Sequence, residues 1–170
     1  MPPKKAPPIK ITKDYTFFYT AQTPFSQFYK CEFTEEGTTF CCAEQYMMYR
    51  KAKLFDDLEI ANLILEETLP SKIKALGRRV EGFSDEVWIG QREIIAKQGN
   101  LLKFGQNADL KERLLETGTT SLVEASGGDV IWGIGLSIKN PAIDNKKNWK
   151  GLNLLGKILT QVRDEFKTKV

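Results

Sequence analysis

Glu44 and Lys51 have types and spacing that could do chemistry, because one is an acid and the other an amine. They stand seven residues apart in "AEQYMMYRKAKLF", residues 43–55, a segment built of good helix formers. Seven residues are close to two helical turns, so both side chains would share one helix face about 10 Å apart. Met47 and Met48 lie between them on that face. The pair marks either two walls of a pocket or the two ends of a buried stripe, and Glu44 alone is also explained by the helix dipole.

A second candidate is "GGDVIWGIG", residues 127–135, in which four glycines surround Asp129 and Trp132. Glycine permits tight turns and a close approach of the backbone to other groups. The segment is therefore either a glycine-rich turn with a half-buried tryptophan or the wall of a site for a flat or phosphorylated ligand.

Three more residues near expected helix ends have two interpretations each. Trp88, early on the longest expected helix, fits core packing as well as stacking against a ligand. Arg78 follows a glycine at a helix end, where a guanidinium compensates the helix dipole or binds a phosphate. Asn153 precedes "LLG" at the start of the last expected helix, where capping is the simpler function and a place in a pocket the other.

The chain contains no histidine. This excludes Ser-His-Asp and Cys-His catalysis and the zinc sites that need histidine. The three cysteines, Cys31, Cys41 and Cys42, cannot complete a four-cysteine zinc site. Their odd number and the adjacent pair argue against a disulfide framework and favour a reducing, intracellular location. In an enzyme of this composition, protons must move through Glu, Asp, Lys, Tyr, Cys or water.

The elements that must position these residues are mainly helices. Aromatic and β-branched runs in residues 15–40 predict short strands that form a hairpin or a three-stranded ribbon, and residues 120–126 predict one more strand. Helical periodicity and caps predict helices in six segments: 43–55, 56–67, 69–77, 84–104, 107–118 and 151–166. The expected architecture is mainly α, a single compact α+β domain over residues 15–170 with a small N-terminal antiparallel β element. Residues 1–14, rich in Pro and Lys, are expected to be a flexible basic tail.

Composition limits the class of protein. The hydrophobic fraction of 41% and the charged fraction of 28% are those of a globular protein. The net charge of +3 is too small to argue for nucleic-acid binding by itself. No apolar run is long enough to span a bilayer, and the start "MPPKKAPPIK" has no hydrophobic core of a secretory signal. We therefore expect a cytoplasmic monomer without membrane contact, with the nucleus as an alternative location.

Eight segments, in a fixed order, resemble the YbiA-like (NADAR) family, and together they cover roughly residues 17–166. They are "PFSQFY" (24–29), "AEQYMMYRKA" (43–52), "LGR" (76–78), "VWIGQR" (87–92), "KFGQN" (103–107), "LLETGTTSLVEAS" (114–126), "DVIWGIG" (129–135) and "NLLGKIL" (153–159). The sequence departs from the family pattern in places. Gln27 stands where Asn is usual, Met47 and Met48 stand where an aromatic residue and Gln are common, and residues 136–153 form a longer loop.

The resemblance implies a YbiA-like fold and hydrolysis of an N-glycosidic bond between ribose and an exocyclic amine. One branch of the family acts on phosphoribosylamino-pyrimidinone intermediates of riboflavin biosynthesis. Another branch removes ADP-ribose from guanine bases of nucleic acid. The family positions carried over to this chain are Glu44, Trp88 and Asp129, with Lys51, Trp132 and Asn153 as further pocket residues.

The chemistry of the bond assigns roles to these positions. Cleavage of the C1′–N bond builds positive charge on the sugar, so one of the two carboxylates stabilises that charge and the other handles protons. Lys51 either holds a phosphate or attacks ring-opened ribose to form a Schiff base. The expected site needs no metal and no cofactor. The expected catalytic residues are Glu44, Asp129 and Lys51, and the expected substrate-binding residues are Trp88, Trp132, Gly133, Arg78, Asn153, Phe18 and Ser26.

Cationic groups favour the larger substrate. Arg78, Arg79 and the four lysines of residues 136–151 exceed what one phosphate needs, which favours ADP-ribosylated guanine, as a nucleoside or in nucleic acid. The riboflavin-pathway pyrimidinone is the alternative substrate. A module that binds ADP-ribose or a nucleotide without cleaving it is the alternative of another class.

Overall fold

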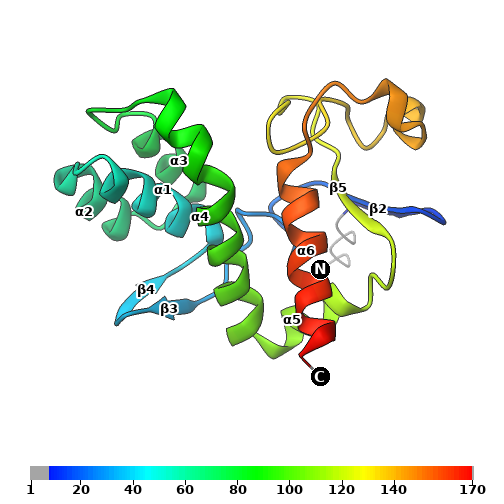
Figure 1. Cartoon of the computed structure of the whole chain (residues 1–170), viewed down its shortest axis with the longest axis horizontal. Helices are drawn as coiled ribbons and strands as arrows, with labels where there is room; N and C mark the ends of the chain where they lie inside the picture. Colours follow the sequence, from blue (N-terminus) through cyan, green and yellow to red (C-terminus); the bar gives the residue numbers. More distant parts are fainter. Residues whose placement is uncertain (1–7, 170) are drawn as a thin grey trace, which may run out of the picture. The chain divides into compact units, whose positions relative to one another are not determined.

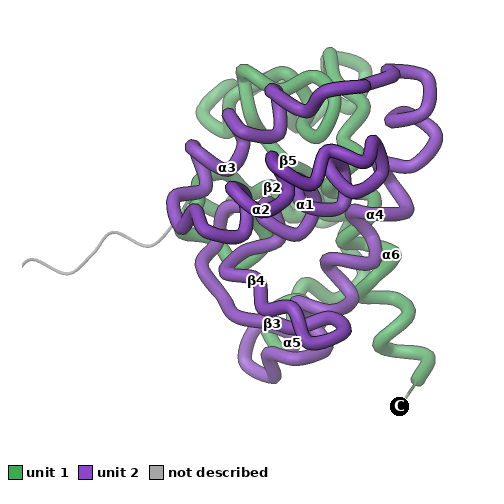
Figure 2. Tube along the Cα trace, turned by 90° about the vertical axis from the view of Figure 1, so that its left-hand side faces the viewer, with its two compact units in different colours: residues 1–26, 112–170 green, residues 27–111 purple. Residues whose placement is uncertain are grey.

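The computed structural model describes residues 8–169, and these residues fold into two compact units (Figure 2). The central unit is Gln27–Lys111. The terminal unit combines Met1–Ser26 with Glu112–Val170. Between residues 8 and 169, no helix is long and apolar enough to cross a membrane.

The central unit is built around helix α1, which packs against α2, α3 and α4 (Figure 1). Its elements are β3 (Phe33–Glu35), β4 (Thr38–Phe40), α1 (Ala43–Leu54), α2 (Leu58–Glu66), α3 (Pro70–Gly77) and α4 (Asp85–Gln106). Phe40 and Tyr46 pack edge to face, 5.1 Å between ring centroids, which holds the hairpin against α1. The hairpin turn runs through Glu36 and Gly37, both with positive φ, as a tight two-residue turn requires.

Side-chain caps fix where the central helices begin. The hydroxyl of Ser84 accepts a hydrogen bond from the Val87 N–H, as the sequence predicts. Asp57 caps α2 in the same way, and the Cys42 sulfur accepts the N–H of Gln45 at the start of α1. These caps place Glu44 in the first turn of α1 and Trp88 in the first turn of α4.

The terminal unit is a small sheet with one helix packed on it. Its elements are β1 (Ile9–Ile11), β2 (Tyr15–Phe18), β5 (Ser121–Glu124), the short 3₁₀ helices η1 (Pro141–Asp144) and η2 (Lys146–Asn148), and α6 (Leu154–Thr168). Strand β2 is central, antiparallel to β1 and parallel to β5, and α6 packs on β5. The core beside the sheet contains Phe17, Val123 and Ile134, with Trp149 packed against it. Helix α5 (Ala108–Leu115) spans the boundary between the two units.

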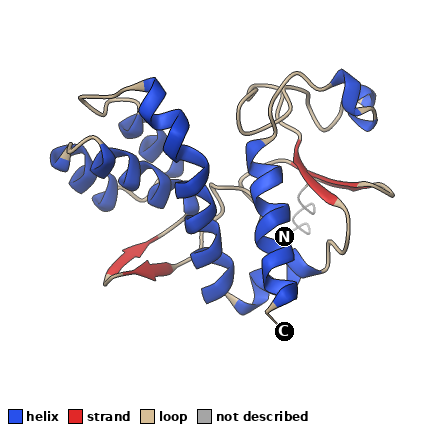
Figure 3. Cartoon of the chain, in the orientation of Figure 1, coloured by secondary structure: helices blue, strands red, loops and turns tan. Residues whose placement is uncertain are grey.

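The predicted fold class is confirmed, because helices dominate and the sheets are small (Figure 3). The predicted hairpin is confirmed as β3–β4, and residues 120–126 do contain a strand. Strand β2 joins a different, mixed sheet, since its partners are β1 and the distant β5. The predicted boundary of the tail was placed too late: Ile9–Ile11 pairs with β2, because backbone hydrogen bonding to an ordered strand fixes it. Residues 1–7 of that predicted tail lie outside the described residues.

Candidate active site

Glu44 and Lys51 both lie on α1, as their spacing predicts. Glu44 is only 4% exposed, although it is an acid, and its N–H donates to the Gln27 carbonyl oxygen at 2.9 Å. An acid that is withdrawn from water in the first turn of a helix keeps its favourable interaction with the helix dipole. A buried carboxylate of this kind can stabilise a cation that develops beside it.

Lys51 is surrounded by a carbonyl and two aromatic rings. Its ammonium donates to the carbonyl oxygen of Gly77 at 2.8 Å, where the last carbonyls of α3 carry partial negative charge. The Lys51 nitrogen also lies 4.6 Å from the ring centroid of Phe83 and 5.4 Å from that of Trp88. Cation–π contacts of this length hold the amine in place.

The pKa of Lys51 is lowered from its ordinary value, chiefly because burial disfavours the charged form. The Glu44 carboxylate raises this pKa and the Arg78 guanidinium lowers it further, so all three charges interact. A lysine with a lowered pKa has a larger fraction of neutral, nucleophilic amine at a given pH. The central unit therefore brings together four of the predicted site residues, Glu44, Lys51, Arg78 and Trp88.

A glycine allows α3 to reach the lysine. A Cβ at Gly77 would lie 2.0 Å from the sulfur of Met48, so a larger residue does not fit while Met48 stays in place. Met47 and Met48, the apolar residues between Glu44 and Lys51, are both buried. The interpretation as two ends of a buried stripe is thus correct for the methionines, while Lys51 itself remains partly exposed.

Two buried side-chain amides, those of Gln27 and Asn100, contact each other in the central unit. Asn100 on α4 is fully buried and donates to the side-chain oxygen of Gln27 at 3.0 Å. Within residues 8–169, the Gln27 Nε2 and the Asn100 Oδ1 have no hydrogen-bond partner. Buried polar atoms without partners are rare and call for an explanation such as a bound ligand or water. The backbone carbonyl of the same Gln27 accepts the Glu44 N–H at the start of α1.

Sequence reasoning did not assign a role to Phe83 or Asn100. Phe83 is a lone aromatic residue in a short loop, and nothing in its sequence neighbourhood indicates a lysine partner. Asn100 carries a weak signal, a polar side chain within the apolar repeat of residues 94–102. That signal alone does not distinguish a buried amide from an exposed one.

The terminal unit holds the remaining predicted residues. Oδ1 of Asp129 accepts the N–H groups of Ile131 at 2.9 Å and Trp132 at 2.8 Å, which is the geometry of an Asx turn. Trp132 is half-buried. The glycine-rich segment is therefore a turn closed by its own aspartate.

Gly133 packs against backbone. A Cβ at this position would lie 2.9 Å from the Glu124 carbonyl oxygen and 3.0 Å from that of Asp129. Asn153 is similarly occupied: its amide donates to the Leu122 carbonyl oxygen at 3.1 Å and accepts the Glu124 N–H at 3.0 Å. Asn153 has a left-handed backbone and makes no side-chain cap of α6, so the simple capping function was wrong. Both residues connect the loop to the end of β5.

Phe18 lies at the end of strand β2, and Ser26 follows that strand along the chain. Phe18 pairs with Glu124 across the β2–β5 ladder and is buried, with its ring 5.6 Å from that of Phe25. The Ser26 N–H donates to the Thr23 carbonyl oxygen at 3.1 Å. The terminal unit thus gathers Asp129, Trp132, Gly133, Asn153 and Phe18 around the end of β5, with Ser26 following Phe25 along the chain.

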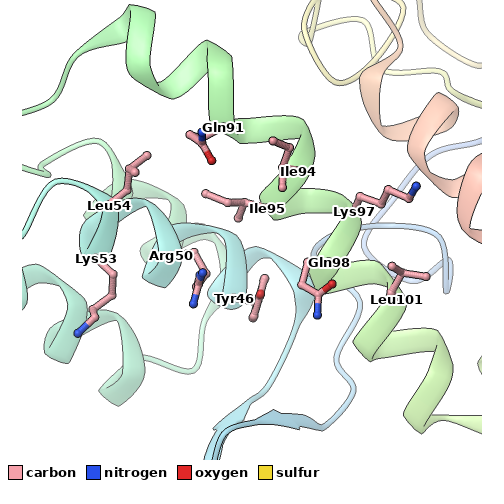
Figure 4. A pocket seen from close by; sticks show the side chains of 10 residues that line it. All are labelled: Tyr46, Arg50, Lys53, Leu54, Gln91, Ile94, Ile95, Lys97, Gln98 and Leu101. Atoms are coloured by element: carbon pink, nitrogen blue, oxygen red, sulfur yellow. The ribbon is translucent and has the colours of Figure 1, made fainter.

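A cavity of about 510 Å³ lies between α1 and α4 (Figure 4). None of the predicted site residues lines it. Its lining from α1 comes from positions on the opposite side of the helix to Glu44 and Lys51. The lining residues are Tyr46, Arg50, Lys53, Leu54, Gln91, Ile94, Ile95, Lys97, Gln98 and Leu101.

The sequence model of the NADAR domain matches residues 16–167. This chain therefore belongs to the NADAR domain family, and the matched region draws on both compact units. The resemblance seen in the eight segments is confirmed.

Individual relatives agree with this assignment. The chain is 43% identical over 165 residues to N-glycosidase R617 of Acanthamoeba polyphaga mimivirus, a match that covers 91% of this chain and 97% of R617. It is 30% identical over 141 residues to riboflavin biosynthesis protein VVA0006 of Vibrio vulnificus, covering 83% of this chain and 35% of VVA0006. Among solved structures, it is similar to the NMR structure of the Escherichia coli protein YbiA, with a TM-score of 0.76 and 24% identity over 94% of this chain and 89% of YbiA. The YbiA similarity supports the fold.

Proposed function

We propose that this protein hydrolyses an N-glycosidic bond between ribose and an exocyclic amine, and that its substrate is ADP-ribose attached to guanine. The observation that carries the reaction class is the group formed by Glu44, Lys51 and Trp88 in the central unit. Membership of the NADAR family, with R617 named an N-glycosidase, supports the same class.

Glu44 is the residue we assign to the charge that develops during cleavage. As the C1′–N bond breaks, positive charge accumulates on the ribose, and the departing amine takes up a proton while water adds to C1′. A buried carboxylate stabilises the sugar cation more strongly than a solvated one, because the surrounding dielectric is lower. Asp129 is our candidate for the second carboxylate. Because its Oδ1 already accepts two backbone N–H groups, we assign Oδ2 as the oxygen that interacts with the substrate.

Lys51 is suited to attack on C1′ of ring-opened ribose. Its lowered pKa supports a nucleophilic amine, and the carbonyl of Gly77 and the rings of Phe83 and Trp88 orient it. On the covalent route the Lys51 amine adds to C1′ of the ring-opened glycosylamine, the bond from C1′ to the base nitrogen breaks, and the base leaves as its free amine. Water then hydrolyses the Lys51 Schiff base, which restores the lysine and releases the sugar. The alternative is that Lys51 acts only as a positive charge beside a phosphate. The two functions are separated by a borohydride experiment described in the Discussion.

The choice of ADP-ribosyl-guanine rests on the cationic groups. Arg78 is exposed and interacts with Lys51, so it can bind one phosphate of a diphosphate close to the reacting group. Residues 136–151 of the terminal unit add four lysines, three of them exposed in or next to η2. The riboflavin-pathway pyrimidinone is kept as the second candidate, because the relative VVA0006 is named a riboflavin biosynthesis protein.

The test offers both substrates to the same purified protein. We expect release of free ADP-ribose and unmodified guanine from a guanine-ADP-ribosylated oligonucleotide, measured by chromatography. Cleavage of the phosphoribosylamino-pyrimidinone alone would overturn the substrate and keep the reaction class. Tight binding of ADP-ribose without cleavage of either substrate would overturn the enzymatic function and support a binding module.

A further inference from the structure

The three cysteines of the chain lie close together in the central unit, at the start of α1. The Cys31 N–H donates to the Cys41 carbonyl oxygen at 3.1 Å, just beyond the paired residues of the β3–β4 hairpin. This single backbone hydrogen bond holds the two residues side by side, although the Cys41 N–H itself donates to Gln45. A disulfide needs Cα atoms about 4.4–6.8 Å apart, so the backbone contact makes Cys31 and Cys41 candidates for such a bond.

The three thiols differ in their exposure to solvent. Cys31 and Cys41 are both partly exposed, whereas Cys42 is buried and caps α1. Cys31 and Cys41 also interact electrostatically, because a charge on Cys41 raises the pKa of Cys31. The accessible pair is therefore Cys31 and Cys41, which are ten residues apart in the chain.

The surroundings favour the thiolate of Cys41. The pKa of Cys41 is lowered to about 7, chiefly because the Cys42 thiol donates a hydrogen bond to it; Lys30 contributes in the same direction, while burial and Glu67 oppose the change. Burial raises the pKa of Cys31, so this second thiol stays protonated. Thiolates react with peroxides while thiols do not, so Cys41 is the residue that reacts first.

A buried cation interacts with Cys31. Lys103 on α4 is fully buried and its charge interacts with Cys31 and Cys42. Its nitrogen is 5.7 Å from the ring centroid of Tyr29 and 4.9 Å from that of Phe104. Lys103 thus lowers the pKa of Cys31 against the opposing effects of burial and Asp109, while at Cys41 the nearby cation is Lys30, opposed by Glu67. Among the described residues, no group of three or more His, Cys, Asp or Glu side chains could hold a metal ion.

We propose that Cys41 and Cys31 form a peroxide-sensitive thiol pair that closes to a disulfide. The Cys41 thiolate attacks hydrogen peroxide, breaks the O–O bond and becomes a sulfenic acid, with hydroxide as the leaving group. The Cys31 thiol then attacks the Cys41 sulfur, the S–O bond breaks, and water leaves. Two electrons pass from the two thiols to one peroxide, and a dithiol reductant reverses the change.

The disulfide would act directly on the turn that carries Glu44. The Cys41 N–H donates to the side-chain oxygen of Gln45 at 2.7 Å, and the Cys42 sulfur accepts the Gln45 N–H at 3.4 Å. Gln45 is the neighbour of Glu44, and its amide also holds the end of α2 through the Ile64 carbonyl oxygen. Oxidation therefore changes the bonding of the first turn of α1. The disulfide itself does not depend on the proposed activity.

The experiment uses the full chain with the substitution Cys42→Ser. Serine keeps a hydrogen-bond donor and a helix cap, and it removes the ambiguity of two adjacent cysteines. The protein is treated with hydrogen peroxide, alkylated, and cleaved after glutamate, which separates Cys31 from Cys41 at Glu32, Glu35 and Glu36. We expect mass spectrometry to show one intramolecular Cys31–Cys41 disulfide, with both thiols recovered after dithiothreitol.

Matched variants complete the test. Cys31→Ser should leave a sulfenic acid at Cys41 that dimedone captures, and Cys41→Ser should leave Cys31 fully alkylated after peroxide. Thermal melts of the three single variants establish that each is folded. The wild-type chain should lose two of its three free thiols. A Cys41–Cys42 disulfide in the wild type, a disulfide only between chains, or full alkylation of Cys31 after oxidation of Cys41 would each overturn the proposal.

Discussion

At the scale of single residues, the environment of Lys51 separates a nucleophile from a structural cation. Its ammonium is already bonded to the Gly77 carbonyl and lies against the rings of Phe83 and Trp88. A purely structural lysine would keep these contacts through catalysis. A nucleophile must leave the carbonyl and form a bond to C1′. The lowered pKa of Lys51, caused mainly by burial, favours the second function.

Sodium borohydride distinguishes the two functions of Lys51. If a Schiff base forms, reduction during turnover should add the mass of the sugar moiety to the peptide that contains Lys51. Lys51→Arg keeps the charge and cannot form this adduct, so its activity should fall by at least about 100-fold. Retained activity in Lys51→Arg, together with no adduct in the wild type, would contradict the nucleophile and support the charge.

Glu44→Gln tests the assigned acid. The substitution preserves shape and removes the charge, so we expect kcat to fall by about 100–1,000-fold with an almost unchanged melting temperature. Steady-state kinetics and a thermal melt measure the two quantities. Glu59→Gln, at an exposed position of α2, is the matched control and should keep full activity. Equal turnover by both variants would remove Glu44 from the mechanism.

We expect Lys103 to make the free energy of unfolding depend on pH. Burial lowers its pKa in the folded protein to about 8, whereas the unfolded chain keeps a value near 10.5. Between these values the unfolded state binds more protons, so this lysine makes the free energy of unfolding rise as the pH increases from about 8 to 10.5. The contribution amounts to as much as about 3 kcal/mol.

Urea denaturation at a series of pH values measures this effect in the wild type and in Lys103→Met. Methionine fills similar apolar space without a charge. The difference between the two proteins isolates the contribution of the lysine from those of the other titrating groups. Parallel curves for the two proteins would show that Lys103 keeps its ordinary pKa.

At the scale of elements, the contact between α1 and the end of α3 determines where the Lys51 amine lies. This contact requires a glycine, since a Cβ at Gly77 would lie 2.0 Å from the Met48 sulfur. The same close approach brings the last carbonyl of α3 within hydrogen-bond distance of Lys51. The close packing of α1 against α3 therefore also positions Lys51.

Gly77→Ala should destabilise the protein by about 1–3 kcal/mol, because Met48 must move or the helices must separate. Gly90→Ala is the control on α4, where no atom lies within 4 Å of the added Cβ, and it should stabilise by about 0.5–1 kcal/mol. Chemical denaturation gives both values. In the Met48→Ala background, Gly77→Ala should cost less than it does in the wild type, and an equal loss in both backgrounds would place the strain elsewhere.

At the scale of the whole molecule, the two carboxylates assigned to catalysis belong to different compact units. Glu44 lies in Gln27–Lys111, and Asp129 lies in the unit formed by both ends of the chain. Kinetic measurements can test whether Glu44 and Asp129 act in the same reaction, and this test does not require the distance between them. Residues that act as a unit show strongly non-additive losses when they are removed together.

We expect Glu44→Gln combined with Asp129→Asn to reduce kcat/KM by about as much as the more damaging single substitution. Initial rates for the wild type, the two single variants and the double variant provide the cycle. Because Asp129 also closes a turn, the melting temperature of Asp129→Asn is measured beside its rate. Losses that multiply in the double variant would show that the two acids act independently.

The sequence by itself determined the local features of this protein. Helix starts at Ser84 and Asp57, the hairpin turn at Gly37 and the shared face of Glu44 and Lys51 all depend on residues within a few positions of one another. Such interactions are encoded in short segments, because caps, turn conformations and helical spacing are local. The family segments were recognisable for the same reason, since they preserve short patterns in order.

Tertiary structure decided which distant residues meet. The parallel pairing of β2 with β5 joins residues about a hundred positions apart, and no local pattern specifies that partner. Contacts of Lys51 with Phe83 and the Gly77 carbonyl, and the amide pair of Gln27 with Asn100, likewise depend on how helices pack. Packing is selected by the fit of whole faces rather than by spacing along one segment. For that reason the sequence predicted the chemically capable residues, and the structure showed which groups surround each of them.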